Sequence, residues 1–255
     1  MQKQHFWSPV QSPEDPTHFH LDVTNLCCVG PADVQFLMGG VSTAAVIDAM
    51  EQATGRPLFW ATVQFVGGAT LGDRVDIKVD LPERQGRVLQ LGATMSCNDR
   101  LLLRVMGATG GREGRGDCFA QMPAVPAPED SDLWAVETLA AGDNMFSQFE
   151  RRIAHIDENA GTQCFWSRMH GNPPTSVGQL AVIADCFLGC HSYTHRGTSL
   201  DHGMRIHNQV ETEWVLTQVQ FDGFTRGGAH GHFFQFAEDG TLLTSGAQTG
   251  LAPRG

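Results

Sequence analysis

The chain has 255 residues, 41% of them hydrophobic and 18% charged, so it can bury an apolar core without metals or disulfides. Lys and Arg total 17 against 28 Asp and Glu, and the formal net charge of −11 argues against general nucleic-acid binding. No stretch approaches the roughly 18 apolar residues of a membrane span and the start lacks a signal-peptide core, so we expect a cytoplasmic protein.

Two halves of the chain repeat short sequences in the same order. Ala45-Val46-Ile47 recurs as Ala181-Val182-Ile183, an offset of 181 − 45 = 136, and Asp99-x-x-Leu102-Leu103 recurs as Asp239-x-x-Leu242-Leu243, an offset of 239 − 99 = 140. Conserved order and spacing indicate a duplication. The stretch 110–130 is rich in Gly and then Pro, as linkers are. We therefore predict an N-terminal domain at 1–110, a linker at 111–143 and a C-terminal domain at 144–255.

The first half reads as one helix followed by several strands. A helix is predicted over 41–54, after Gly39-Gly40, and it should stop at Gly55 because a glycine followed by Pro57 ends helices. Extended runs with turn signals between them follow at 58–66, 73–82, 87–97 and 100–108.

The second half follows the same plan. Its predicted strands are 145–156, 162–169, 203–209, 213–221, 229–237 and 241–248, and its helix is 175–189. One helix per four or more strands predicts an antiparallel α+β architecture. Both helices are apolar on nearly every face, so each must be surrounded. A curved antiparallel sheet wrapped around a central helix, present twice, is a tandem (double) hotdog; a pair of unrelated α+β sandwiches would read similarly.

Gln248 is a candidate catalytic residue because the two copies differ there. Under the 140-residue offset its counterpart is Ala108, so one copy has an amide where the other has a methyl group. An amide can donate to a developing oxyanion or hold a water. The alternative is a structural amide that caps backbone groups at a strand end.

Three acids are candidate bases. Ser199-Leu200-Asp201-His202 leads from a loop into the strand at Met204, and a carboxylate at such a junction can accept a proton from water. Asp201 could instead tie its own turn together. Asp185 and Asp48 lie in apolar helices, where burial raises the pKa of an unpaired acid. We rank both below Asp201.

Glycines interrupt the strand pattern between Phe221 and Gly228, which indicates a bulge or a close approach to the backbone. Asp222 or Thr225 in this segment could add a third polar group to the site.

Several motifs together resemble the double-hotdog acyl-CoA thioesterase II (TesB-like) family. They are Phe36-x-x-Gly39-Gly40, Trp166-x-Arg168, Ala184-Asp185, Ser199-Leu200-Asp201-His202, Glu213-Trp214-x-Leu216, Arg226-Gly227 and Gln248-x-Gly250. The resemblance places the water-activating aspartate on Asp201 and the family's glutamine on Gln248. The family's third member, a hydroxyl, falls near Asp222 or on Thr225, and a histidine of its first half is Thr62 here.

The resemblance implies hydrolysis of an acyl-CoA by a water held by Asp201 and Gln248. Backbone amides at Gly40 and Val41 would share the oxyanion charge. Arg226, with Arg196 or Arg205, would bind the anionic CoA. No cofactor is implied beyond the CoA of the substrate, and the resemblance allows a homodimer or a higher homo-oligomer.

Two other functions stay open. A hotdog enoyl-CoA hydratase would use Asp201 and His207. A non-catalytic acyl-CoA-binding protein would fit the displaced hydroxyl and Thr62. The pairs His18-x-His20 and His230-x-His232 place two imidazoles on one strand face but lack the further ligands of a zinc site, so no metal is predicted.

Overall fold

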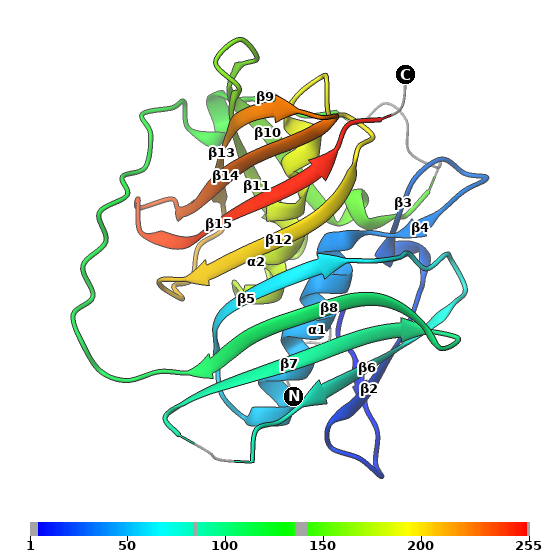
Figure 1. Cartoon of the computed structure of the whole chain (residues 1–255). Coiled ribbons are helices and arrows are strands. Elements are labelled where there is room, and N and C mark those ends of the chain that lie inside the picture. The colour runs from blue at the N-terminus through cyan, green and yellow to red at the C-terminus, as the bar shows by residue number, and fades with distance from the viewer. Residues whose placement is uncertain (1–4, 84–85, 136–141, 254–255) are drawn as a thin grey trace. The chain divides into compact units, whose positions relative to one another are not determined.

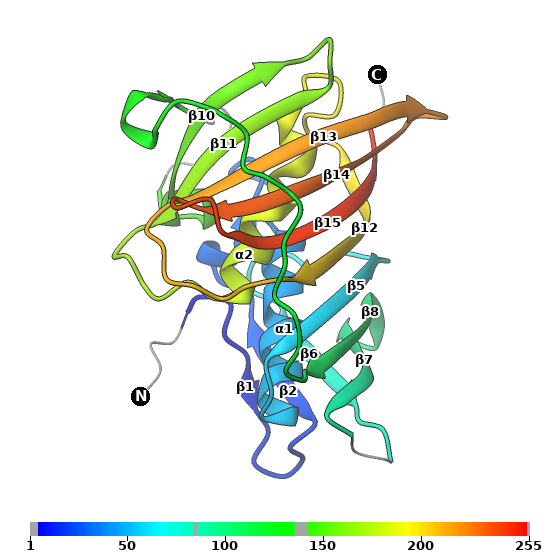
Figure 2. The ribbon, with the colours of Figure 1, turned by 90° about the vertical axis from the view of Figure 1, so that its left-hand side faces the viewer.

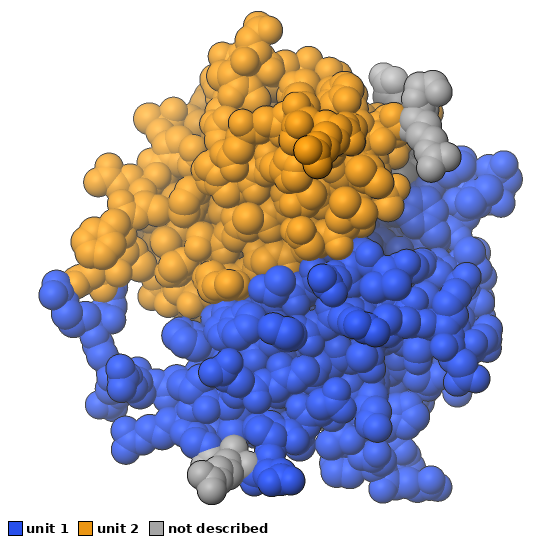
Figure 3. All heavy atoms as spheres, in the orientation of Figure 1, with its two compact units in different colours: residues 1–116, 138–148 blue, residues 117–137, 149–255 orange. Residues whose placement is uncertain are grey.

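The computed structural model describes residues 5–83, 86–135 and 142–253 (Figure 1). The chain divides into unit 1, residues 1–116 and 138–148, and unit 2, residues 117–137 and 149–255 (Figure 3). The predicted linker is therefore divided between the two units, and most of it belongs to unit 2. No helix in the described ranges is long and apolar enough to cross a bilayer.

Unit 1 is an antiparallel sheet with strand order β1-β2-β6-β7-β8-β5. The strands are β1 (Val10–Gln11), β2 (His18–Asp22), β5 (Leu58–Phe65), β6 (Arg74–Asp80), β7 (Val88–Cys97) and β8 (Arg100–Gly110), and a separate pair is formed by β3 (Cys28–Val29) and β4 (Phe36–Leu37). The four strands predicted after the first helix are thus confirmed to within about two residues at each end.

Helix α1 (Gly39–Thr54) packs on this sheet and is the core of unit 1. Its residues from Gly40 to Met50 are buried except Asp48, which is half-buried. The helix ends as predicted at Gly55, whose φ of 63° is the left-handed conformation that glycine adopts readily, and the Gly55 N–H bonds to the Glu51 carbonyl.

Unit 2 has strand order β12-β15-β14-β13-β11-β10-β9, again antiparallel throughout. The strands are β9 (Asp132–Leu133), β10 (Phe149–Asp157), β11 (Thr162–Met169), β12 (Thr198–Ile206), β13 (Val215–Thr225), β14 (Gly228–Ala237) and β15 (Leu242–Leu251). The predicted strands of the second half are present, but β12 begins five residues earlier than predicted. Ser199 to His202 are therefore strand and not loop, because they pair with β15.

Helix α2 (Val177–Ala184) is the buried core of unit 2, and every residue in it is buried. The Ser176 side chain caps its start by accepting from the Gln179 N–H. The predicted helix continues to 189, but the last part is a 3₁₀ helix, η4 (Asp185–Cys190). At the junction the Asp185 N–H reaches the carbonyls of both Ala181 and Ile183, which tightens the turn.

The predicted linker is not a free tether. Residues 117–135, which we call the strap, contain the short helix η2 (Pro128–Asp130) and β9, and the strap runs across the face of the unit 2 sheet that lies away from α2 (Figure 2). Its apolar side chains pack against a buried cluster on that face: Ala120, Met122 and Val125 meet Cys164, Trp166, Trp214, Leu216, Phe236 and Leu242. The Trp166 indole N–H donates to the Pro126 carbonyl at 2.9 Å.

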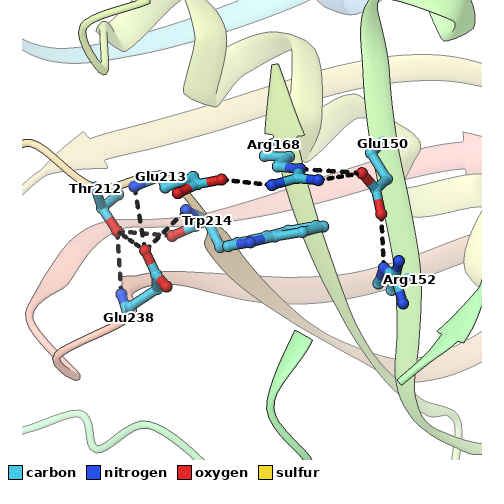
Figure 4. A network of polar contacts seen from close by, with 7 residues as sticks. All are labelled: Glu150, Arg152, Arg168, Thr212, Glu213, Trp214 and Glu238. Atoms are coloured by element: carbon cyan, nitrogen blue, oxygen red, sulfur yellow. Dashed lines mark hydrogen bonds and ion pairs between the residues drawn. The ribbon is translucent and has the colours of Figure 1, made fainter. Parts of the chain in front are cut away.

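A network of charged groups holds β10, β11 and the turn before β13 together (Figure 4). Glu150 accepts from Arg152 and Arg168, and the Arg168 guanidinium also pairs with Glu213 and lies 4.5 Å from the Trp214 ring centre. Burial alone would raise the pKa of Glu150, but the hydrogen bonds from Arg168 and Arg152 lower it overall. These contacts stabilise the fold, and each group already has partners within the network.

Candidate functional site

The polar cluster of interest lies between η4, β12 and β15 of unit 2. The Gln248 Nε2 donates to the Asp185 Oδ1 at 3.0 Å and to the Ser199 Oγ at 2.9 Å. The Ser199 hydroxyl is 3.3 Å from the same Asp185 oxygen. The Gln248 Oε1 lies 3.0 Å from the His202 Nδ1. These four side chains form one connected hydrogen-bond network, which we call the Gln248 network.

Each member is positioned by a different local feature. Asp185 is the first residue of η4, directly after the buried helix α2. Gln248 is directly opposite His202 in the β15–β12 pairing, so both side chains lie on the same sheet face. Both are buried, whereas Asp185 and Ser199 are half-buried.

Ser199 joins this face because of a β-bulge. In regular β12 pairing, Ser199 would share a face with Asp201 and point away from His202. The register shifts between Ser199 and Asp201, so that Ser199 pairs with Gly250 and Asp201 with Thr249. The extra residue, Leu200, turns Ser199 to the face of Gln248. Bulges redirect side chains in this way beside active sites.

The charge state of the cluster follows from burial. Burial lowers the pKa of His202 from 6.5 to about 4, against the opposing effects of the Gln248 hydrogen bond and the Asp201 charge. His202 is therefore neutral at neutral pH. A carboxylate with two donors, an amide and a hydroxyl can hold a water molecule and accept its proton.

The structure separates the two residues on which the sequence-based site was built. The Asp201 Oδ1 accepts from the Thr249 backbone N–H at 3.1 Å, and Asp201 shares a face with Thr249. Gln248 is on the other face, where its side chain is hydrogen-bonded to Asp185, Ser199 and His202. The side chains of Asp201 and Gln248, which we expected to act on one water molecule, have no hydrogen-bond partner in common in the described part of the chain. The role of Asp201 stays a prediction.

The other predicted site residues lie elsewhere. Asp222 is an exposed residue whose carboxylate is 3.0 Å from the His232 Nδ1. Thr225 and Arg226 are exposed at the turn between β13 and β14. The side-chain hydrogen bonds of Gln248 in the described part of the chain go to other residues than these three. Gly40 and Val41 are buried in the first turn of α1, in unit 1.

The histidines considered for catalysis or metal binding have ordinary partners. His207 is exposed, and its Nε2 contacts the Ser245 hydroxyl at 2.8 Å. His230 contacts the Thr249 hydroxyl and His18 lies 3.4 Å from Asp76. In the described ranges, no group of three or more His, Cys, Asp or Glu side chains is arranged to hold a metal ion.

The sequence did not predict that Ser199 and Asp185 are the residues that contact Gln248. The signal for Asp185 was present, because an acid at the end of an otherwise apolar helix needs donors and Gln248 supplies one. Ser199 was hidden because strand alternation puts it on the same face as Asp201, and a bulge has no certain signature in one sequence.

Comparisons with known proteins agree with this architecture. Residues 119–252 match a family model described as the acyl-CoA thioesterase C-terminal domain. A protein from Novosphingobium aromaticivorans that is provisionally named a thioesterase has 25% identity and a TM-score of 0.90, over 97% of this chain and 99% of that chain. No curated protein matches the sequence significantly.

Two further solved structures share the fold. The tesB protein of Mycobacterium avium subs paratuberculosis has 17% identity and a TM-score of 0.82, over 98% of this chain and 97% of that one. A hot dog fold protein of unknown function from Alicyclobacillus acidocaldarius has 18% identity and a TM-score of 0.83, over 99% and 100% of the two chains.

The architecture is therefore that of the hotdog-fold thioesterases. The chain belongs to the TesB-like acyl-CoA thioesterase family, as its motifs predicted.

Proposed function

We propose that the protein hydrolyses the thioester bond of an acyl-CoA to a free acid and CoA, and that the Gln248 network is its active site. Family membership supports a thioesterase activity. The observation that carries the assignment to this site is the Gln248 amide, which donates to a carboxylate and a hydroxyl at once in a largely buried setting. This arrangement replaces Asp201 with Asp185 as the proposed base.

In this mechanism a water molecule binds beside the Asp185 carboxylate. Asp185 accepts a proton as the water oxygen bonds to the thioester carbonyl carbon. The carbon–sulfur bond then breaks, the CoA sulfur leaves as a thiolate, and the proton held by Asp185 neutralises it. The Gln248 amide and the Ser199 hydroxyl orient the carboxylate and the water.

A hydratase mechanism has less support from the contacts of this chain. It needs an acid that can give a proton to a substrate carbon. His202 is neutral with a pKa of about 4 and contacts Gln248, so it is a poor proton donor. Asp201 and His207, the pair considered from sequence, each contact a different residue.

The finer features of the proposal are those of the resembled family. We propose that the two units are tandem hotdogs, that CoA enters only as part of the substrate, and that no other cofactor takes part. We further propose that the protein works in the cytoplasm and as a homodimer or higher homo-oligomer, and that Arg226 contacts CoA.

The matched pair Asp185→Asn and Asp201→Asn tests the proposed base. We expect free-thiol release from a panel of acyl-CoA esters by the native protein, a fall in kcat of about 10³-fold or more for Asp185→Asn, and a change within a few-fold for Asp201→Asn. A large loss for Asp201→Asn alone would restore the assignment made from sequence.

Three further measurements test the role of Ser199 and separate a thioesterase from a hydratase and from a binding protein. Ser199→Ala should lower kcat more than Thr225→Ala or Asp222→Asn, and Ser199→Thr should retain most activity. Loss of enoyl absorbance from crotonyl-CoA without thiol release would favour a hydratase. Tight acyl-CoA binding with neither reaction would favour a binding protein.

A further inference from the structure

We infer that His202 is a positioning residue that fixes the Gln248 amide with its two hydrogens directed at Asp185 and Ser199. This inference rests on the proposed function, because it assigns a role in the same site. It goes further in explaining why a buried histidine stands opposite the glutamine.

The Gln248 amide has two orientations of similar shape, and only one suits the site. A carboxylate can only accept hydrogen bonds, so the amide nitrogen must face Asp185. The amide oxygen then lies in a buried position, where it needs a donor. The His202 Nδ1 lies 3.0 Å from this oxygen and is its hydrogen-bond partner. Without that donor the buried oxygen would be unsatisfied, at a cost comparable to a lost hydrogen bond, and the productive orientation would lose its advantage.

The chemistry of the imidazole matches this role. Burial holds the pKa of His202 at about 4, so the ring is neutral and carries a single N–H. Since the Gln248 Oε1 can only accept, that hydrogen is on Nδ1. His202 Nε2 is buried without a hydrogen-bond partner among the described residues, as suits the unprotonated nitrogen of this tautomer.

The ring itself is held by packing. The His202 imidazole stacks on Phe233, with ring centres 5.2 Å apart and planes 22° from parallel. Phe233 in turn lies against the bare backbone of Gly246, where an added Cβ would sit 2.4 Å from the Phe233 ring. Gly246 therefore makes room for Phe233, and Phe233 fixes the plane in which the Nδ1–H points.

Unit 1 has no matching pair on the helix-facing side of β5 and β8. Gly107 faces Met50 of α1, and the β5–β8 pairs on that side are Leu58–Thr109, Ala61–Gly107 and Val63–Val105, which include neither an amide nor an imidazole. The imidazole and the amide therefore occur together in unit 2, as expected if the histidine orients the glutamine side chain.

The tautomer gives a test that does not depend on activity. In ¹⁵N NMR spectra of the full chain at pH 7, we expect His202 to show a protonated Nδ1 and an unprotonated Nε2. A protonated Nε2, or a doubly protonated ring, would overturn the inference whether or not the protein is a thioesterase.

Kinetics gives the second test, with the matched variants His202→Leu and His202→Asn. Leu removes the donor, whereas the Asn side chain can place an N–H near the Nδ1 position. We expect kcat to fall about 10- to 100-fold in His202→Leu with KM nearly unchanged, and to recover largely in His202→Asn.

A double-mutant cycle with Gln248→Ala separates positioning from a general structural effect. If His202 acts through the amide, His202→Leu should lower kcat little further once Gln248 is absent. Additive losses in folded variants, as judged by circular dichroism, would overturn the inference. Absence of thiol release by the native protein would instead refute the proposed function and leave the NMR test standing.

Discussion

Unit 1 and unit 2 are two versions of one scaffold, and only one of them has the Gln248 network. In both, a buried helix packs on an antiparallel sheet, and the strand carrying the residue opposite Ala108 or Gln248 has a bulge near its start. Unit 2 has Asp185 where the repeat offset puts Ala49. Gln248 faces the helix side of its sheet, whereas Ala108, its counterpart by offset, lies on the opposite face of the unit 1 sheet because the adjacent Gly107 faces Met50 of α1. The scaffold thus supplies the geometry, and a few side chains supply the chemistry.

The outer sheet faces differ as well. The unit 2 sheet has aromatic and aliphatic residues on its outer face, and the strap covers them. The outer face of the unit 1 sheet is mostly polar, and its apolar Met106 has 66% of its surface exposed. A polar sheet face can stay exposed to water, whereas the apolar outer face of unit 2 is stabilised when the strap buries it.

The largest expected effect is the loss of activity when the Gln248 amide is removed from unit 2. Gln248→Ala gives unit 2 the residue that the repeat offset puts in unit 1. We expect kcat for thiol release to fall about 10²-fold, because the Asp185 carboxylate and the Ser199 hydroxyl lose the amide that orients them. The reverse change, Ala108→Gln, should add no activity because Ala108 lies on the sheet face away from α1, where the amide would meet no counterpart of Asp185. Equal rates for Gln248→Ala and native protein would remove the amide from the mechanism.

Much of this comparison was readable in the sequence. The repeat, the two apolar helices and most strand limits were predicted because they depend on periodicity and on glycine or proline signals. The sequence contrast between Gln248 and Ala108 made the amide a candidate, although Ala108 lies on the other face of its sheet. The partners of the amide were not predictable, because Ser199 reaches it through a bulge and Asp185 through the end of a helix, and both depend on tertiary packing.

Asp48 is the half-buried acid of helix α1, where the repeat offset puts Ala184 in unit 2, and it should make stability depend on pH. Burial, and then the nearby Glu51 charge, raise the pKa of Asp48 from 3.8 to about 7. The folded state therefore holds a proton that the unfolded state releases, so stability is lost as pH rises from about 4 through 7. Relative to native protein, Asp48→Asn should gain up to about 4 kcal/mol in unfolding free energy over that range.

Urea denaturation of both proteins at pH 5 and pH 8 measures this difference. The variant should gain stability relative to native protein at the higher pH. A constant difference between the two pH values would show that Asp48 ionises normally.

His202 in unit 2 should have the opposite effect on the pH dependence of the unfolding free energy. Its pKa falls from 6.5 to about 4 through burial, so the unfolded state binds a proton first as pH decreases. The contribution of neutral His202 to the unfolding free energy is therefore fully present above pH 6.5. It is lost as the pH falls through 4, which lowers the unfolding free energy by up to about 3 kcal/mol. Between pH 7 and pH 4.5, the unfolding free energy should depend less on pH in His202→Asn than in the native protein. The exposed control His155→Asn should keep the pH dependence of the native protein.

The smallest expected effect concerns the strap. Trp166→Phe keeps an aromatic ring in the outer cluster but removes the indole N–H that donates to Pro126, and an unmade hydrogen bond of this kind costs about 1 kcal/mol. The strap should then detach more often, so limited proteolysis between 117 and 127 should be faster while kcat stays unchanged. Met106→Ala on the exposed outer face of unit 1 is the matched control and should change stability by less than about 0.5 kcal/mol. If both variants behaved alike, the strap would be no more than a tether, and the difference between the two outer faces would have no consequence for stability.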